Sequence, residues 1–409
     1  MKIAYREINS ASPRYWAAAG ALALLALLGL AAAYVMEEHG HVITGMTNQI
    51  VWGVPHVFAV FLIVAASGAL NVASIASVFG RAMFKPLAPL SGLLALALLA
   101  GGLSVLVLDL GRPERLIVQM THYNLKSNFA WNVFLYIGFV AVVAVYLWTM
   151  MERRMNAYSR RAGTVAFVWR LVLTTGTGSI FGFLVAREPY DSALLAPLFI
   201  ALSFSYGLAI YLLVLLVTYR ATARPLGSVV LARLARLQAI FIAAALYFVV
   251  VFHLTNLYLA QRQDVERFFL WDGVYSALFW LGQVLLGSVV PLAVLFHPRL
   301  GKSPKAIAVA AGLVVLGGIA QMYVTIIGGQ AYPLDLFPGM VATSTFYDGV
   351  VHGYVPSLPE IALGVGGVAI AGVIVVVATT LLRFVPERLD DSLIAGLDER
   401  VGPPARATT

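Results

Sequence analysis

Ten long apolar stretches constrain the fold of this sequence more than any other feature. They are 15–36, 50–80, 86–108, 127–151, 162–186, 192–219, 237–261, 273–298, 306–334 and 361–382, and Arg170 is the one charged residue within them. A helix needs about 20 apolar residues to cross the hydrocarbon core of a membrane. Because unpaired backbone N–H and C=O groups are costly in hydrocarbon, each stretch is predicted to be helical. The sequence therefore predicts an all-α integral membrane protein with ten transmembrane helices.

The composition agrees with a membrane protein and excludes other classes. Of the 409 residues, 61% are hydrophobic and 11% are charged, whereas a soluble domain has about 25% charged residues. A soluble enzyme, a disordered protein and a nucleic-acid-binding module are therefore excluded, despite a net charge of +8. The sequence has no cysteine, so no disulfide, zinc–thiolate site or cysteine-ligated iron–sulfur cluster can belong to this chain.

The basic residues predict the orientation. Twenty of the 27 Lys and Arg residues fall in the termini and the even-numbered gaps between spans, and six fall in the odd-numbered gaps. By the positive-inside rule, both termini are predicted to be cytoplasmic. The N-terminus is too long and too mixed in charge for a cleavable signal. We expect one polytopic domain over 1–383 and a cytoplasmic tail over 384–409, with a short interfacial helix followed by disorder.

The outer side carries the more elaborate loops. Twelve of the nineteen acidic residues are predicted to lie there. The segment 328–360 contains four prolines and no Lys or Arg. A loop of this length usually covers a site or binds a partner, so we expect it to do one or the other.

Polar residues gather on one face of the second predicted helix. Each residue of an α-helix advances about 100° around the axis, which places His56, Ser67, Asn71 and Ser74 on the same side. A packing seam of small residues would also account for the two serines and Asn71. His56 is interpreted as a functional residue, because an imidazole near the outer boundary can bind a ligand carbonyl and titrate near neutral pH.

Arg170, in the fifth predicted helix, has Thr174 and Thr177 on its own face. Either its guanidinium snorkels towards the cytoplasmic interface, or it is a fixed charge in an aqueous path for protons or water. The candidate residues of such a proton path are Ser67, Asn71, Ser74, Arg170 and Thr174.

Metal and haem sites are not predicted. Haem b needs two histidines facing each other, and His56 and His253 are the plausible intramembrane candidates. The acidic and histidine-containing run at 37–41 is interpreted as a solvated loop rather than a metal site.

The segment 107–136 follows the third predicted span. Asp109 ends that span, and Arg112 can fold back to pair with it across a turn forced by Gly111 and Pro113. Further along lie Asn124, Trp131 and Asn132. We expect these groups to converge near the depth of His56, where they would suit an amphipathic head group with carbonyls, such as a quinone.

The string DLGRP at 109–113, followed by N-x-x-S-x-x-A-W-N at 124–132, resembles the hallmark of the NrfD/PsrC family. This family comprises the quinone-interacting membrane subunits of polysulfide reductase-like complexes. The ten-helix layout and the late YVPSLPEIALGVGG segment resemble a longer branch of the family. Within that branch, the run EEHGH…VWGVPHVFAV looks most like DsrP, from the DsrMKJOP sulfur-metabolism complex. Hydrogenase-2-type and ActC-like quinone subunits are the alternative branches.

The resemblance implies two four-helix bundles, helices 2–5 and 6–9, with helices 1 and 10 peripheral. It implies menaquinone or ubiquinone near the periplasmic face of a bacterial inner membrane. The implied partners are a periplasmic ferredoxin-like iron–sulfur subunit (DsrO-like), a multihaem cytochrome c and further membrane subunits. By this resemblance His56 and Asp109 are the catalytic residues, and Arg112, Asn124, Trp131 and Asn132 also bind the quinone.

The predicted spans depart from the family's pattern in one respect. The proton path proposed for the family uses acids within helices, and none of these ten stretches contains one. A secondary transporter or ion channel remains an alternative, because Gly176, Gly178 and Gly182 could break a helix, although no matching break occurs in the second half. A membrane anchor without any site is the third alternative.

Overall fold

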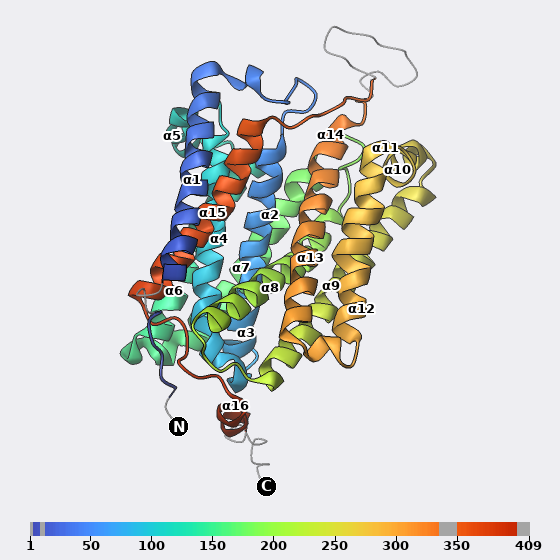
Figure 1. The fold of residues 1–409 in the computed structure, drawn as a ribbon. Helices are drawn as coiled ribbons and strands as arrows, with labels where there is room; N and C mark the ends of the chain where they lie inside the picture. Colours follow the sequence, from blue (N-terminus) through green and yellow to red (C-terminus); the bar gives the residue numbers. More distant parts are fainter. Residues whose placement is uncertain (1–2, 9–12, 335–349, 399–409) are drawn as a thin grey trace, which may run out of the picture.

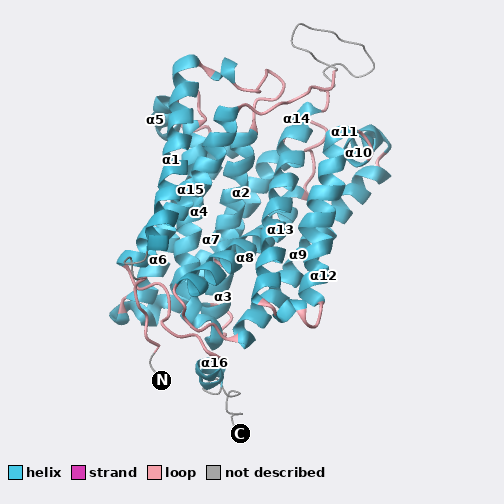
Figure 2. Ribbon diagram, viewed as in Figure 1, coloured by secondary structure: helices cyan, strands magenta, loops and turns pink. Residues whose placement is uncertain are grey.

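The computed structural model describes residues 3–8, 13–334 and 350–398. Over these residues it contains ten helices long and apolar enough to cross a membrane, which confirms the predicted number and places. The described part has no β-strand and only two isolated backbone bridges, so the all-α class is also confirmed (Figure 2).

The spans follow one another in the order of the predicted stretches. The first five are α1 (Pro13–His39), α2 (Val54–Ala69) continued by α3 (Asn71–Ser77), α4 (Ala88–Leu108), α6 (Asn128–Met151) and α7 (Ser159–Gly182). The next two are α8 (Leu195–Ala221) and α9 (Ser228–Tyr258). The eighth joins α11 (Gly273–Ala277), the π-helical η6 (Leu278–Val289) and α12 (Val290–Phe296). The last two are α13 (Pro304–Tyr323), with η8 (Val324–Gly328) and α14 (Gly329–Ala331), and α15 (Leu358–Leu381).

Short helices connect or flank the spans. They are α5 (Leu116–Thr121), α10 (Gln263–Leu270) and α16 (Asp391–Asp398), together with the 3₁₀ turns η1 (His41–Ile43), η2 (Ala82–Leu87), η3 (Pro113–Arg115), η4 (Arg153–Tyr158), η5 (Ala260–Arg262) and η7 (Leu300–Lys302). Helix α16 lies in the predicted tail, and residues 399–409 and much of the proline-rich segment (335–349) lie outside the described residues.

The helices pack side by side (Figure 1). Helix α2 packs against α4, α7 and α8, and α6 packs against α4 and α7. Helix α8 in turn packs against α9 and α13, and η6 packs against α13. Helix α15 packs against α1, α4 and α2. Helices α2 and α8 are therefore the central pair that joins the two halves of the chain.

Glycines allow the closest helix approaches. Gly68 of α2 lies against the backbone of Ser203, and Gly207 of α8 lies against the backbone of Gly68. Gly29 and Gly366 bring α1 and α15 together in the same way. Helices associate in membranes largely through such small residues, because lipid chains are as apolar as the side chains they would replace.

The two chain ends lie at the same end of the bundle, which we call the termini end (Figure 1). Tyr5 forms a backbone bridge with Pro386, and Leu226 forms one with Leu389. The opposite end, called the far end, carries residues 40–53, α5 and α10.

Candidate functional site

A histidine and a carboxylate meet at the far end. Helix α2 begins at Val54, with Pro55 in the first turn where its missing N–H needs no partner. Asp109 is the C-cap of α4. Because α2 and α4 are packed neighbours running in opposite directions, the start of one lies beside the end of the other. Nδ1 of His56 therefore lies 2.8 Å from Oδ2 of Asp109.

A second histidine contacts the same carboxylate. Nε2 of His41 lies 3.8 Å from Oδ1 of Asp109 and 3.0 Å from its backbone oxygen. The contacts of the carboxylate are close but not aligned as regular hydrogen bonds. His56 Nδ1 and both Asp109 oxygens are buried without a well-aligned partner among the described residues. The carboxylate is thus held between two imidazoles by charge and proximity.

These contacts shift the pKa values of the two groups outside the spans. Burial by itself would raise the pKa of the Asp109 carboxyl, but His41 and His56 outweigh it and hold that pKa below its ordinary value. The contact with Asp109 raises the pKa of His41, with a smaller contribution from Glu37, against a partial lowering by burial. The arrangement therefore favours an ionised carboxylate beside a readily protonated His41.

An apolar cavity of about 420 Å³ opens beside this pair. Helices α2, α4, α5, α6 and α7 contribute its lining, which includes His56, Asn132, Tyr136 and Thr177 among mainly aliphatic and aromatic side chains. Trp52 stacks on the His56 ring, with centroids 6.1 Å apart and planes inclined by 27°. The volume and the few polar groups are those of a small-molecule site rather than a packing defect.

Asn132 is one of the predicted site residues that line the cavity. Its Nδ2 donates to the carbonyl oxygens of Asn128 (3.0 Å) and Gly176 (3.2 Å). Its Oδ1 is buried and has no hydrogen-bond partner in the described part of the chain. Asn132 therefore offers a free acceptor for a hydroxyl donor.

Three other predicted site residues do not reach the cavity lining. Arg112 is exposed, and within the described residues the expected ion pair with Asp109 is absent, because His41 and His56 cover the carboxylate. Asn124 is exposed and accepts from the backbone N–H of Lys126 (3.0 Å), which closes a local turn.

Trp131 is the third of these residues and is 50% exposed. Its indole N–H donates to the carbonyl oxygen of Leu125 at 2.9 Å. Neighbouring residues on a helix point about 100° apart. Asn132 and Val133 line the cavity, whereas Trp131, about 100° from Asn132 on the other side, lies outside the lining.

The predicted path residues form a buried hydrogen-bonded cluster. Thr174 Oγ1 donates to Ser67 Oγ (2.6 Å), and Arg170 donates from NH1 to the Ser67 carbonyl (3.1 Å) and to Asn71 Oδ1 (2.6 Å). Ser74 is buried on the same helix face but lies outside these hydrogen bonds. Four of the five residues are thus brought together.

Arg170 itself does not snorkel. It is 2% exposed, and its guanidinium lies 5.0 Å from the ring centroid of Phe167 and 4.9 Å from that of Phe204. Among the described residues, no carboxylate pairs with it. The snorkelling interpretation is therefore wrong, and the charge is held in place by hydrogen bonds and aromatic faces.

His253, the second candidate haem ligand, contacts a carboxylate at the far end of the other half. Its Nδ1 lies 2.6 Å from Oε2 of the fully buried Glu266. Asn256 donates to the other carboxylate oxygen of Glu266 at 2.8 Å. The cavity of about 40 Å³ beside His253 is too small for a ligand head group.

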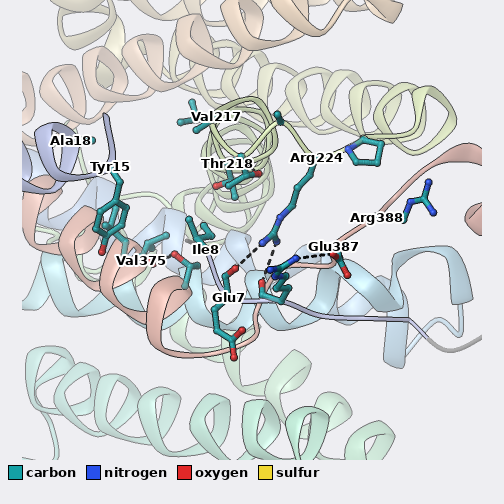
Figure 3. Close-up of a pocket in the computed structure, with 17 residues that line it drawn as sticks. Glu7, Ile8, Tyr15, Ala18, Val217, Thr218, Arg224, Val375, Glu387 and Arg388 are labelled. Atoms are coloured by element: carbon teal, nitrogen blue, oxygen red, sulfur yellow. Dashed lines mark hydrogen bonds and ion pairs between the residues drawn. The ribbon is translucent and has the colours of Figure 1, made fainter. Parts of the chain in front are cut away.

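A larger cavity, of about 930 Å³, lies at the termini end (Figure 3). Arg224 crosses it to donate to the carbonyl oxygens of Arg6 (3.2 Å) and Glu7 (2.8 Å). Arg6 also pairs with Glu387 at 3.2 Å. Arg224 and Arg6 already have partners, so they are not available to bind an anionic ligand. The cavity is better explained as the space where the N-terminal and C-terminal segments pack together.

Two groups at the far end were missed by sequence reasoning. His41 was interpreted as part of a solvated loop, and no local pattern connects that loop to the end of α4. The lining also includes Gln119 and Met120 of α5, a helix of six residues. The available signal was the segment's position directly after Asp109, at the same membrane boundary.

The described residues combine ten helices able to cross a membrane with an apolar cavity that has a histidine–carboxylate pair at its edge, which defines a polytopic membrane protein. The model of the family described as polysulphide reductase, NrfD matches residues 42–333. The chain therefore belongs to the NrfD family, whose members are membrane subunits of quinone-interacting oxidoreductase complexes.

Three curated relatives agree with this assignment. The chain is 29% identical over 398 residues to the Hdr-like menaquinol oxidoreductase integral membrane subunit of Archaeoglobus fulgidus, covering 96% of this chain and 100% of the relative. It is 30% identical over 410 residues to the putative membrane C subunit of dimethyl sulfoxide reductase from Halobacterium salinarum, covering 90% of each chain. It is 23% identical over 409 residues to the C subunit of selenate reductase from Mesobacillus selenatarsenatis, covering 89% of this chain and 92% of the relative.

Proposed function

We propose that this subunit exchanges electrons and protons with a membrane quinone in the cavity beside His56 and Asp109. The observation that carries the proposal is the 2.8 Å contact between these two residues at the edge of an apolar cavity of about 420 Å³. A quinone needs both features, because its tail is apolar and its redox chemistry moves protons at its ring oxygens. The apolar cavity wall would contact the tail, and the histidine–carboxylate pair would transfer the protons of the ring oxygens.

His56 is the proton-transfer group in this proposal. With Nδ1 directed at Asp109, Nε2 is the nitrogen left to meet a ligand oxygen. The ionised carboxylate orients the ring through its contact with Nδ1. Asn132 supplies a second contact through its free Oδ1, which can accept a hydrogen bond from a quinol hydroxyl.

The electrons pass to a partner protein in this proposal. The chain has no cysteine to ligate an iron–sulfur cluster of its own. We place a ferredoxin-like iron–sulfur partner (DsrO-like) on the far end, next to α5. That helix lines the cavity with Leu116, Gln119 and Met120, while Ile117 and Val118 are exposed to a neighbour. A multihaem cytochrome c and further membrane subunits would complete the complex.

The far end is assigned to the periplasmic side of a bacterial inner membrane. The support is the excess of basic residues in the termini and even-numbered gaps, which the positive-inside rule assigns to the cytoplasm. Menaquinone is favoured over ubiquinone, because the relative from Archaeoglobus fulgidus is named for menaquinol. The likeness of the segment around Glu37 to DsrP favours a role in sulfur metabolism.

The test is quinone-linked electron transfer in the assembled complex. His56→Gln and Asp109→Asn each remove proton transfer while keeping side-chain size, and we expect each to lower the rate about 10²–10⁴-fold. Arg112→Gln is the matched control, because Arg112 is exposed and outside the cavity lining. Normal electron transfer in both site variants, with complete complexes, would contradict the proposal and leave the transporter and anchor alternatives.

A further inference from the structure

We propose that His41 is the proton exit of the quinone site, passing protons between Asp109 and the water at the far end. This inference rests on the proposed quinone chemistry at His56, and it adds a residue that neither the sequence pattern nor the family match assigns. His41 does not contact the cavity, so it acts through Asp109 as a positioning and relay residue.

The three side chains follow one another from the cavity outward in the order His56, Asp109, His41. Asp109 is sealed between the two rings, with 1% of its side chain exposed. The side chain of His56 is 18% exposed and lines the cavity, and that of His41 is 28% exposed. His41 is therefore the member of the series that meets solvent, and a proton on Asp109 has an imidazole at 3.8 Å on its outer side.

The backbone around His41 fixes the ring in this place. Gly40 has a φ of 76°, a left-handed conformation that favours glycine, and it precedes the short turn of His41–Ile43. Thr44 Oγ1 donates to the His41 carbonyl at 2.6 Å. Nε2 of His41 contacts the Asp109 carbonyl oxygen at 3.0 Å. That oxygen can only accept, so the contact is a hydrogen bond whenever Nε2 carries a proton, and Nδ1 is the second nitrogen at which the ring can exchange protons.

The charges around His41 favour proton uptake by its ring. The groups that face it are Asp109 at the end of α4, Glu37 on α1 and, across the carboxylate, His56 on α2. Two of these are acids. An imidazole beside two carboxylates accepts protons readily and releases them to water as it exchanges tautomers.

Proton transfer from the site towards the interior of the bundle is less favourable. On the inner side of the cavity lies the cluster of Thr174, Ser67 and Arg170. The Arg170 guanidinium is buried without a carboxylate among its described contacts. A fixed, uncompensated cation repels protons, as arginines do in water-selective channels. Protons from the site therefore leave towards His41 rather than through the bundle.

The balance of one turnover follows from these contacts. Oxidation of a hydroquinone breaks two O–H bonds, sends two electrons to the iron–sulfur clusters of the partner and releases two protons. For each proton, His56 starts with its own proton on Nδ1, accepts the quinol proton at Nε2 and gives the Nδ1 proton to Asp109. His41, with its proton on Nδ1, takes that proton from Asp109 at Nε2 and releases the Nδ1 proton to water. Both rings are then left with a proton on Nε2, and each returns to its Nδ1–H tautomer before the second proton of the turnover follows. Quinone reduction uses the same steps in reverse.

The experiment compares His41 variants in the assembled complex. His41→Gln keeps a polar side chain but cannot titrate, and we expect a fall in kcat of about 10-fold or more with KM changed by less than twofold. His41→Ala is expected to fall further and to recover when imidazole is added to the buffer. His39→Gln is the matched control, because the exposed His39 ring bonds the Val35 carbonyl oxygen of its own helix (3.1 Å). It should leave the rate and the pH profile unchanged.

The possible outcomes separate this inference from the proposed function. If His41→Gln keeps its rate and pH profile while His56→Gln is inactive, the quinone site stands and the exit lies elsewhere. If the His41 variants lose affinity for a quinone analogue and imidazole restores nothing, the role of His41 is structural and the inference is overturned. If His56→Gln is also fully active, the proposed function itself has failed.

Discussion

Gln330 holds Trp52 in place through both atoms of its side-chain amide. Its Oε1 accepts from the backbone N–H groups of Val51 (2.9 Å) and Trp52 (3.0 Å), and its Nε2 donates to the Trp52 carbonyl (3.0 Å). Gln330 belongs to α14, whereas Trp52 precedes α2 and stacks on His56. The second half of the chain thus sets the position of an aromatic wall of the cavity in the first half.

Replacement of Gln330 by alanine should therefore weaken ligand binding from a distance. Gln330→Ala leaves two backbone N–H groups and a carbonyl without partners, at a cost of about 1–3 kcal/mol each where they stay buried. We expect a lower melting temperature and an affinity for a quinone analogue reduced about tenfold. Titration with the analogue measures the second effect. Gln263→Ala, at an exposed glutamine of α10, is the control and should change neither quantity.

Asn132 and Trp131 give a direct test of which face of α6 meets the ligand. Asn132→Leu removes the free acceptor and the bonds to two carbonyl oxygens, so we expect analogue affinity to fall at least tenfold. Trp131→Phe removes the bond to Leu125 outside the cavity and should change affinity by less than twofold. Equal losses in both variants would show that α6 presents a different face to the ligand.

The pH dependence of stability should reflect the Asp109 contacts. The folded pKa of Asp109 is lowered, so its stabilisation is present above its unfolded value, about 3.9, and is lost as pH falls through the folded value. The folded pKa of His41 is raised, so its stabilisation is present below about 6.5 and is lost as pH rises through the folded value.

The stability lost in Asp109→Asn should therefore be greatest between about pH 4 and 6.5 and smaller on either side. Thermal unfolding of the purified subunit at a series of pH values measures this difference. Asp264→Asn, at an exposed residue of α10, should give a difference from the unmodified protein that does not vary in this way. A constant difference for Asp109→Asn across the same range would contradict the histidine contacts.

Arg170→Lys should destabilise the first half of the chain although it keeps the charge. The planar guanidinium lies between Phe167 and Phe204 while bonding the Ser67 carbonyl and Asn71, and an ammonium group cannot match this geometry. We expect a loss of about 1–3 kcal/mol, measured by thermal unfolding in detergent. Arg161→Lys, at an exposed arginine of the same helix, should have no measurable effect.

The spans could be predicted from the sequence because the charge-free stretches leave few alternatives in a membrane. The meeting of His56 and Asp109 was predicted because consecutive antiparallel spans place the start of one beside the end of the other. Helical periodicity could not decide whether Trp131 or Asn132 lines the cavity. It gives the angle between two side chains but not which face of α6 packs against the bundle. Neither could it decide whether Arg170 points inward, which depends on how α7 is rotated against α2.

The contact of His41 with Asp109 lay beyond sequence reasoning for a different reason. It joins an irregular segment after α1 to the end of α4, across a separation of 68 residues. No periodic pattern relates such segments. The expected ion pair of Arg112 with Asp109 is not formed for the same reason, because the sequence does not show that His41, on the loop after α1, covers the carboxylate.

The contact between Gly68 and Gly207 has a mechanical consequence for the chemistry at the far end. Because the backbones of α2 and α8 touch there, neither helix can slide or tilt without separating the two halves of the molecule. His56 lies on the same helix, α2, about three turns from Gly68. The added methyl group of Gly207→Ala, far from the cavity, would therefore tilt α2 and shift the His56 imidazole.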